Sequence, residues 1–169
     1  MADWKPLKPR KSKNAKQLLQ FVYRVVCCSL RHRASAIVWR LRADGECEVL
    51  LVSSSRDSNK FTLPGGGVEK GETSAIAAAR EVMEEAGVSG ELDSQLLGTV
   101  KDNKKRSRTD VFAMRLTHEH SNWLEAKLGR IRQWIPLHEA DSKLSRKPAA
   151  QQMLRLFWKA RPDLRSKRD

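Results

Sequence analysis

Three observations predict that the chain folds as a single mixed α/β domain. Its 169 residues are about the length of one domain. Short apolar segments rich in β-branched residues alternate with two longer segments of helical character, over residues 73–86 and 148–159. Hydrophobic residues form 40% of the chain and charged residues 31%, a balance that is typical of a chain with a buried core.

The folded part is predicted to begin with a β-hairpin. Residues 34–41 and 48–53 each have the pattern of a strand, and Asp44-Gly45 between them favours a tight turn. A short strand over residues 61–63 ends at Pro64, where three glycines follow. Further strands are expected over residues 96–100, 109–116 and 132–135.

The two ends of the chain differ from its middle. Residues 1–17 are rich in Lys and Pro, and residues 18–30 are apolar without a period that separates helix from strand. We therefore expect a partly disordered basic extension over residues 1–30, the folded domain over residues 31–160 and a basic tail over residues 161–169. A mitochondrial presequence is an alternative for the basic N-terminus.

The segment over residues 73–86 carries the signals of a well-bounded helix. Thr73 is a natural N-cap, alanines fill the interior, and Gly87 is placed to end the helix. With about 100° per residue, one apolar face is predicted from Ile76, Ala79, Met83 and Ala86. Glu81, Glu84 and Glu85 are then expected to project away from the buried face.

The charge balance restricts the class of ligand. Lys and Arg number 33 against 20 Asp and Glu, which gives a formal net charge of +13. Such a surface attracts polyanions, namely nucleic acid, anionic lipid or a highly phosphorylated small molecule, and it argues against a cationic substrate.

Two further features bear on where the protein works. The longest apolar stretch, residues 18–30, contains Gln20, Tyr23 and Arg24 and is shorter than the roughly 20 residues that a spanning helix needs, so stable membrane insertion is not expected. The three cysteines lack metal-ligand or disulfide-framework spacing and favour a reduced compartment. We expect a cytoplasmic protein, with the nucleus as a further location.

Three neighbouring carboxylates on one helix repel one another, and Arg80 alone cannot neutralise them. All-oxygen ligation selects a hard divalent cation, Mg²⁺ or Mn²⁺. The glycines before the helix allow backbone groups to approach such a cation or a phosphate closely. Taken alone, the acidic cluster would more often be an ordinary solvated helix face.

The spacing of the whole segment is more specific than the acidic cluster. Residues 66–88 follow the pattern G-x5-E-x7-RE-U-x-EE-x-G-U without a substitution, in which U is an apolar residue and the fixed positions are Gly66, Glu72, Arg80, Glu81, Glu84, Glu85 and Gly87. This pattern resembles the Nudix box. The resemblance implies a Nudix-type α/β/α sandwich around a mixed β-sheet and a hydrolase that cleaves pyrophosphate links with a divalent cation.

The same resemblance assigns roles to individual residues. Glu81, Glu85 and the backbone carbonyl of Gly65 are expected to bind the cation. Glu84 is expected to act as the general base, with a further cation ligand as the alternative. Gly66, Glu72 and Arg80 are expected to support this arrangement.

A closer resemblance covers about residues 31–158. The segments Ser53–Arg56, Pro64–Gly67 and Gly129-Arg130 are similar to those of the diphosphoinositol polyphosphate phosphohydrolases. In that subfamily basic and polar residues ring the site and bind inositol phosphates. The matching positions here are Arg31, His32, Arg33, Ser54, Ser55, Arg56, Lys105, Arg130 and Lys147.

The expected function is therefore cation-dependent hydrolysis of the diphosphate of diphosphoinositol polyphosphates, with diadenosine polyphosphates as further substrates. Two alternatives remain open. One is an mRNA-decapping hydrolase in which basic arms follow the RNA backbone, and the other is a non-catalytic module that binds polyanions on the same fold. A monomer is the expected state.

Overall fold

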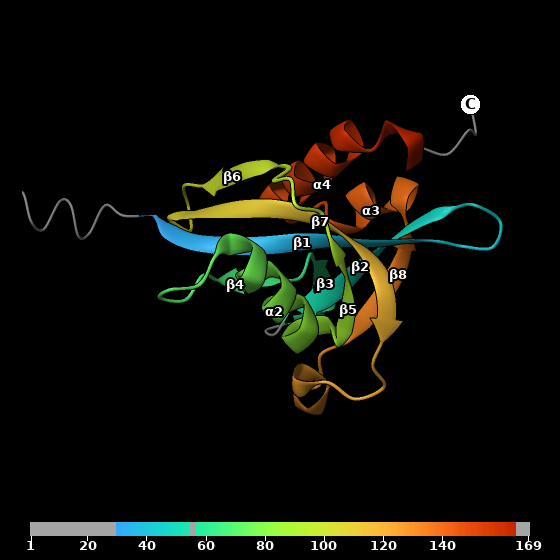
Figure 1. The fold of residues 1–169 in the computed structure, drawn as a ribbon, viewed down its shortest axis with the longest axis horizontal. Helices are drawn as coiled ribbons and strands as arrows, with labels where there is room; N and C mark the ends of the chain where they lie inside the picture. The colour runs from blue at the N-terminus through green and yellow to red at the C-terminus, as the bar shows by residue number, and fades with distance from the viewer. Residues whose placement is uncertain (1–29, 55–56, 165–169) are drawn as a thin grey trace, which may run out of the picture. The chain divides into compact units, whose positions relative to one another are not determined.

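The strands form one mixed sheet in the computed structural model, which describes residues 30–54 and 57–164 (Figure 1). At its centre β1 (Arg31–Leu41) and β7 (Ser107–Glu119) run parallel, from Arg31 opposite Ser107 to Trp39 opposite Arg115. All other pairings are antiparallel. They involve β2 (Cys47–Ser54), β3 (Asp57–Thr62), β4 (Gly65–Gly67), β5 (Val88–Leu92), β6 (Gly98–Asp102) and β8 (Arg132–Pro136).

The strand order explains how distant segments meet. The path runs β3-β2-β1-β7-β5, while β4 pairs with β1, β6 with β7 and β8 with β2. The predicted hairpin is confirmed: β1 and β2 pair antiparallel, and Gly45 takes the left-handed φ of 82° that the tight turn requires. The glycine strand β4 lies directly beside the start of β1, with Gly65 opposite Ser35.

Helices cover both faces of the sheet. The helix α2 (Ser74–Ala86) lies on one face, and α4 (Pro148–Ala160) lies on the other beside the shorter α3 (Leu137–Lys143) (Figure 1). Two 3₁₀ turns, η1 (Leu124–Leu128) and η2 (Pro162–Leu164), complete the described part. The predicted α/β/α sandwich around a mixed sheet is confirmed. None of the helices described is long and apolar enough to cross a membrane.

The ends of α2 are set by its capping residues, as predicted. The side chain of Thr73 accepts a hydrogen bond from the Ile76 amide at 3.3 Å, and Gly87 ends the helix in the left-handed conformation with a φ of 60°. The helix therefore begins at Ser74 and ends at Ala86.

The predicted buried face of α2 is confirmed at Ala86 and wrong at Ile76 and Met83. Ile76 is 60% exposed and Met83 is exposed as well, whereas the buried residues are Ala77, Ala78, Val82 and Ala86. Small alanines face the sheet because they let the helix approach it closely, and a count that begins from the larger Ile76 misses this. The buried face is rotated toward Glu81 and Glu85, so these carboxylates turn to the sheet instead of away from it.

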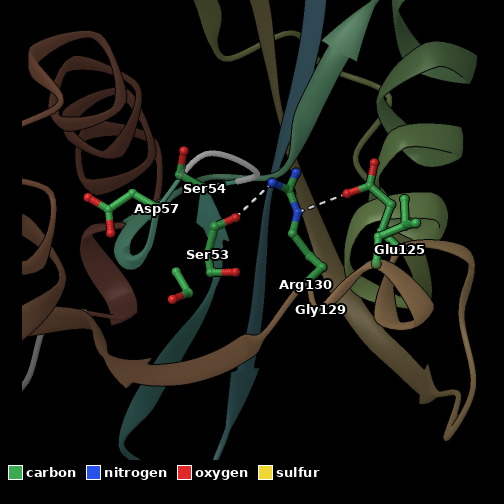
Figure 2. Close-up of a pocket in the computed structure, with 8 residues that line it drawn as sticks. Ser53, Ser54, Asp57, Glu125, Gly129 and Arg130 are labelled. Atoms are coloured by element: carbon green, nitrogen blue, oxygen red, sulfur yellow. Dashed lines mark hydrogen bonds and ion pairs between the residues drawn. The ribbon is translucent and has the colours of Figure 1, made fainter.

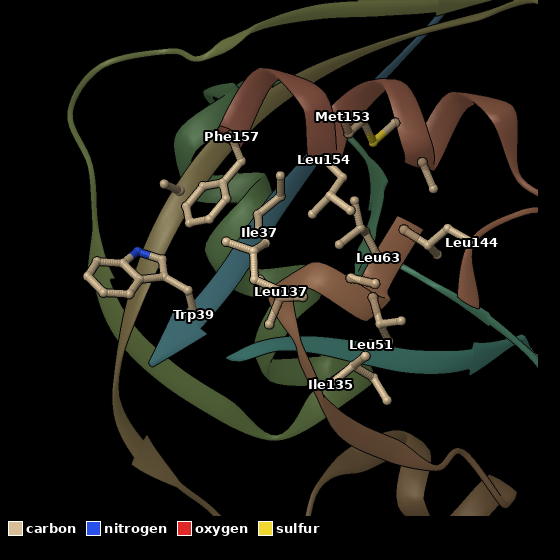
Figure 3. Close-up of a cluster of buried hydrophobic side chains, with 14 of the residues drawn as sticks. Ile37, Trp39, Leu51, Leu63, Ile135, Leu137, Leu144, Met153, Leu154 and Phe157 are labelled. Atoms are coloured by element: carbon tan, nitrogen blue, oxygen red, sulfur yellow. The ribbon is translucent and has the colours of Figure 1, made fainter. Parts of the chain in front are cut away.

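Two hydrophobic clusters fill the two faces. The α4-side core lies between the sheet and α3 and α4 and is built mainly from large side chains, among them Ile37, Trp39, Leu51, Leu63, Ile135, Leu137, Leu144, Met153, Leu154 and Phe157 (Figure 3). The α2-side core lies between the sheet and α2 and holds many alanines, among them Ala34, Ala36, Ala77, Ala78 and Ala86.

Several elements were not predicted. Three residues of β4 are all glycine, and β5 has a glycine in its middle, so neither carries a strand pattern. The helix α3 is only seven residues long, which is too short for a clear helical period. The predicted N-terminal extension, apart from Leu30, lies outside the described residues, as do residues 165–169, Ser55 and Arg56.

Candidate active site

Glu81 is packed directly against the glycine strand β4. A Cβ atom added at Gly66 would lie 2.0 Å from Glu81 Oε1, so only glycine leaves room for this carboxylate. The Glu81 side chain is 14% exposed. Burial raises the pKa of its carboxyl group, and the hydrogen bond from Arg80 opposes that rise. This close packing gives a steric reason to expect that Gly66 supports the site.

Glu85 meets the same strand at its backbone. The Gly65 amide donates to Glu85 Oε2 at 2.9 Å, and Arg130 Nη2 contacts Glu85 Oε1. Burial raises the pKa of Glu85 from 4.5 to about 7, although the Gly65 amide and Arg130 both favour the charged form. The helix and β4, which are consecutive elements of the chain, thus bring two carboxylates and the Gly65 backbone together.

Arg80 connects the loop before α2 to the glutamates on it. Its guanidinium binds Glu72 in a bidentate manner, with Nε to Oε1 at 2.9 Å and Nη2 to Oε2 at 3.0 Å. The same group donates to the Gly67 carbonyl at 2.9 Å and to Glu81 Oε1 at 3.0 Å. The hydrogen bond from Arg80 lowers the pKa of Glu72. Both residues are placed to support the acidic cluster.

Glu84 differs from its two neighbours. Its side chain is 37% exposed, and its Oε2 lies 3.3 Å from Arg80 Nη1. Of the three helix glutamates it is the one with the greatest access to solvent, which suits a group that takes a proton from water.

The donors at this place fit a hard divalent cation. They are the carboxylates of Glu81 and Glu85 and the carbonyl of Gly65, all oxygen, which is the donor set that Mg²⁺ and Mn²⁺ prefer. The Gly65 carbonyl accepts a hydrogen bond from Arg33 Nη2 at 2.7 Å. Among the described residues no group of three His, Cys, Asp or Glu side chains forms a metal cluster. The expected ligand set differs from such a cluster, because it has only two side chains and takes its third oxygen from the backbone.

A pocket of about 380 Å³ is lined in part by Arg130, whose guanidinium contacts Glu85 (Figure 2). Arg130 lies in its wall with only 6% of its side chain exposed, and its buried Nε makes an ion-pair contact but no hydrogen bond. Nη1 donates to the Ser53 carbonyl at 2.7 Å, and Nε lies 2.9 Å from Glu125 Oε2. The lining residues are Ser53, Ser54, Asp57, Ser58, Glu125, Leu128, Gly129 and Arg130. Arg130 is therefore tied to Glu85 and Glu125, which a simple role in binding phosphate does not require.

A second pocket of about 470 Å³ is strongly basic. It contains Lys147, which the sequence predicted as a substrate residue, together with Lys60, Lys143 and Arg146. Asp57, the acid in its wall, lies 2.6 Å from Lys60 Nζ. Because Asp57 lines both pockets, the predicted residues Ser54, Arg130 and Lys147 come together on one part of the surface.

The remaining predicted substrate residues lie near the start of β1. Arg31 donates to the Lys105 carbonyl at 3.0 Å, so these two residues are neighbours although 74 positions separate them. His32 points to the α2 side, where its Nε2 lies 2.7 Å from Asp110 Oδ2. Arg33 reaches Gly65, as described above. Ser55 and Arg56 lie outside the described residues.

Some residues of the site carry no signal in the sequence. Ser53 contacts the predicted residue Arg130 from 77 positions away, and Asp110 contacts the predicted residue His32 from 78 positions away. Glu125 contacts Arg130 from within the same loop region. Lys60, Lys143 and Arg146 are ordinary basic residues in the sequence and become notable only when β3 and the turn before α4 form one pocket.

Comparisons with known proteins agree with this architecture. A family model described as NUDIX domain matches residues 30–157. Diphosphoinositol polyphosphate phosphohydrolase 2 of Rattus norvegicus is 41% identical over 111 residues, which cover 65% of this chain and 60% of that protein. Diphosphoinositol polyphosphate phosphohydrolase 3-alpha of Mus musculus is 42% identical over 112 residues, 65% of this chain and 66% of that protein. The chain thus spans about 60% of the length of the rat relative.

A solved structure gives the same result for the fold. The crystal structure of a C. elegans Ap4A hydrolase superposes with a TM-score of 0.61 over 78% of this chain and 98% of the other, at 23% sequence identity. At this identity the likeness concerns the fold alone. The family model, in contrast, covers well over half of the chain and includes every described residue of the candidate site, and the chain belongs to the NUDIX domain family.

Proposed function

We propose that this chain hydrolyses the diphosphate group of diphosphoinositol polyphosphates in the presence of a divalent cation, Mg²⁺ or Mn²⁺. The observation that carries the proposal is the meeting of Glu81, Glu85 and the Gly65 backbone at the glycine strand β4. The relatives named above, which carry the name of this activity, support the choice of substrate class.

The residues of the site have separate tasks in this proposal. Glu81, Glu85 and the Gly65 carbonyl hold the cation, which supplies Lewis-acid stabilisation of charge on the phosphoryl oxygens. Glu84 takes a proton from the attacking water. The water oxygen forms a new bond to one phosphorus while the bridging P–O bond breaks, and the leaving group departs with that oxygen.

The basic pocket with Lys60, Lys143, Arg146 and Lys147 supports a substrate that carries several phosphates. Clustered cations bind such groups through charge-assisted hydrogen bonds. Arg31, Arg33 and Lys105 extend the positive charge along the start of β1, and we assign Ser54, Ser55, Arg56 and His32 to the same substrate surface by the resemblance described above.

A second candidate substrate is a diadenosine polyphosphate. In the pocket lined in part by Arg130 the carboxylates of Asp57 and Glu125 are balanced by Lys60 and Arg130, and Leu128 at the wall is 81% exposed. Such a neutral, partly apolar wall suits a nucleoside better than a further phosphate. We place this activity second because the neighbouring basic pocket favours the more highly charged inositol substrate.

The proposal is tested by phosphate release from a diphosphoinositol polyphosphate, a diadenosine polyphosphate and a capped RNA, each with Mg²⁺ and with a chelator. We expect cation-dependent release, fastest from the inositol compound. Glu84→Gln should lower the turnover by about 10²- to 10⁴-fold and retain binding of substrate. Preference for capped RNA, or no turnover of any substrate, would contradict the proposal.

A further inference from the structure

A network of short hydrogen bonds joins four elements at the first turn of α2. Asp110 of β7 is its centre. The Ser74 hydroxyl donates to Asp110 Oδ2 at 2.7 Å, and Thr99 of β6 donates to Oδ1 at 2.7 Å. His32 of β1 lies 2.7 Å from Oδ2 through its Nε2 and 3.2 Å from the Ser74 hydroxyl oxygen.

The direction of these bonds follows from their chemistry. An ionised carboxylate only accepts hydrogen bonds, so Nε2 of His32 carries the proton that is donated to Asp110. The Ser74 proton is also directed to Asp110, which excludes attack by Ser74 as a nucleophile activated by His32. Burial alone would raise the pKa of Asp110, but the bonds from Ser74, His32 and Thr99 together lower it, which keeps the acceptor charged.

The network connects the end of β4 to the start of α2, the two elements that carry the expected cation ligands. The His32 carbonyl accepts from the Val68 amide at 3.1 Å, just after β4, and the adjacent Arg33 binds the Gly65 carbonyl. Ser74 is the first residue of α2, whose first turn contains no acidic residue of its own. Asp110 therefore supplies the negative charge that the N-terminal end of a helix favours and ties that end to β1 and β7.

We propose that Asp110 is a positioning residue for the cation site: through Ser74 and His32 it fixes the start of α2 relative to β1 and β4, so that Glu81 and Glu85 meet the Gly65 carbonyl. This inference rests on the proposed function. Seven residues separate Ser74 from Glu81, about 10 Å along the helix, so a tilt of about 5° at Ser74 moves Glu81 by about 1 Å. Metal–ligand distances tolerate only about 0.2 Å.

The test measures Mn²⁺ affinity in the full chain without substrate, from the EPR signal of free Mn²⁺. Ser74→Ala removes the bond from α2, and Asp110→Asn weakens the whole network. We expect Mn²⁺ to bind about 5- to 10-fold more weakly to both variants, less than the roughly 10- to 100-fold that the loss of a direct partner of a ligand costs.

Two matched controls separate positioning from general stability. Thr99→Ala removes a bond to the same carboxylate on the side away from α2 and should change the Mn²⁺ affinity by less than about 2-fold. Thr73→Ala removes the N-cap without touching Asp110 and lowers the urea midpoint of unfolding, yet it should also leave the Mn²⁺ affinity within about 2-fold.

The inference is overturned if Ser74→Ala binds Mn²⁺ as the unmodified protein does. It is equally overturned if Thr73→Ala weakens binding as much as Ser74→Ala, because the effect would then be one of helix stability. If the unmodified protein itself binds no Mn²⁺, the cation part of the proposed function fails and this inference fails with it. If Asp110→Asn does not fold, the Mn²⁺ affinity of Ser74→Ala alone decides the test.

Discussion

The two hydrophobic cores on opposite faces of the sheet are built from different kinds of side chain. The α4-side core holds Trp39, Phe157 and several leucines, whereas the α2-side core holds mostly alanine and valine. Large interlocking side chains bury more apolar surface and contribute more stability. Small ones contribute less but let a helix lie close to the sheet. The first core therefore stabilises the fold, and the second places the glutamates.

The comparison explains why the candidate site lies on the α2 side. Carboxylates on a helix reach only a few ångströms, so the helix must lie close to β4 for Glu81 and Glu85 to meet the glycine backbone. Alanines at Ala77 and Ala78 allow this approach, and glycines in β4 allow it from the other side. The α4 side has no such requirement, because no residue of the acidic cluster comes from α4.

The largest effect is expected from a cavity in the α4-side core. Phe157 is fully buried and lies with its ring centroid 6.4 Å from that of Trp39. Phe157→Ala should lower the free energy of unfolding by about 3–5 kcal/mol, as measured by urea denaturation. The Mn²⁺ affinity of the folded fraction should not change; a loss of affinity that accompanies the loss of stability would show that the two cores do not act separately.

A smaller effect on stability is expected from overpacking the α2-side core. Ala78 is fully buried between α2 and the sheet, so Ala78→Leu must push the helix outward. We expect a cost of about 1–3 kcal/mol together with weaker Mn²⁺ binding. The matched control is Ile76→Ala on the exposed face of the same helix, which should stay within about 0.5 kcal/mol and keep its affinity for Mn²⁺.

A further effect is a pH dependence that originates on the α2 side. Because burial raises the pKa of Glu85 from 4.5 to about 7, the folded state holds its proton after the unfolded state has released it. The contribution of Glu85 to the free energy of unfolding is therefore complete below pH 4.5 and is lost as the pH rises through about 7.

Glu85→Gln isolates this contribution, because the variant and the unmodified protein have all other titrating groups in common. In chelator the variant and the unmodified protein should unfold at similar urea concentrations at pH 4.5, and the variant should become relatively more stable as the pH rises. A constant difference between the two proteins would show that Glu85 titrates normally. Since the proton and a cation compete for the same carboxylate, Mn²⁺ binding should strengthen over the same pH range.

The sequence predicts the elements that have strong local signals. Thr73 and Gly87 bound α2 to within one residue, and Asp44-Gly45 marks the first hairpin. The acidic spacing predicts which glutamates gather, because i, i+3 and i+4 positions share a helix face whatever the helix packs against.

The failures have physical reasons as well. The orientation of α2 depends on which of its many apolar residues face the sheet, and the large Ile76 is a poor guide when close approach favours alanine. The strand character of β4 depends on pairing with β1, since three glycines have no strand preference of their own. Asp110 meets Ser74 only through tertiary structure, so no local pattern reveals it. Glu125 and Arg130 are close in the sequence, but no motif marks them as a pair.

The most direct test of the close approach between α2 and β4 is a comparison of Gly66→Ala with Gly67→Ala. A Cβ at Gly66 would collide with the Glu81 carboxylate, whereas a Cβ at Gly67 meets nothing within 4 Å. Because Glu81 can swing away, Gly66→Ala should keep nearly normal stability and lose at least about 10-fold in Mn²⁺ affinity and in phosphate release. Gly67→Ala should retain both. Equal activity in the two variants would contradict the placement of Glu81 against β4 and, with it, the proposed cation site.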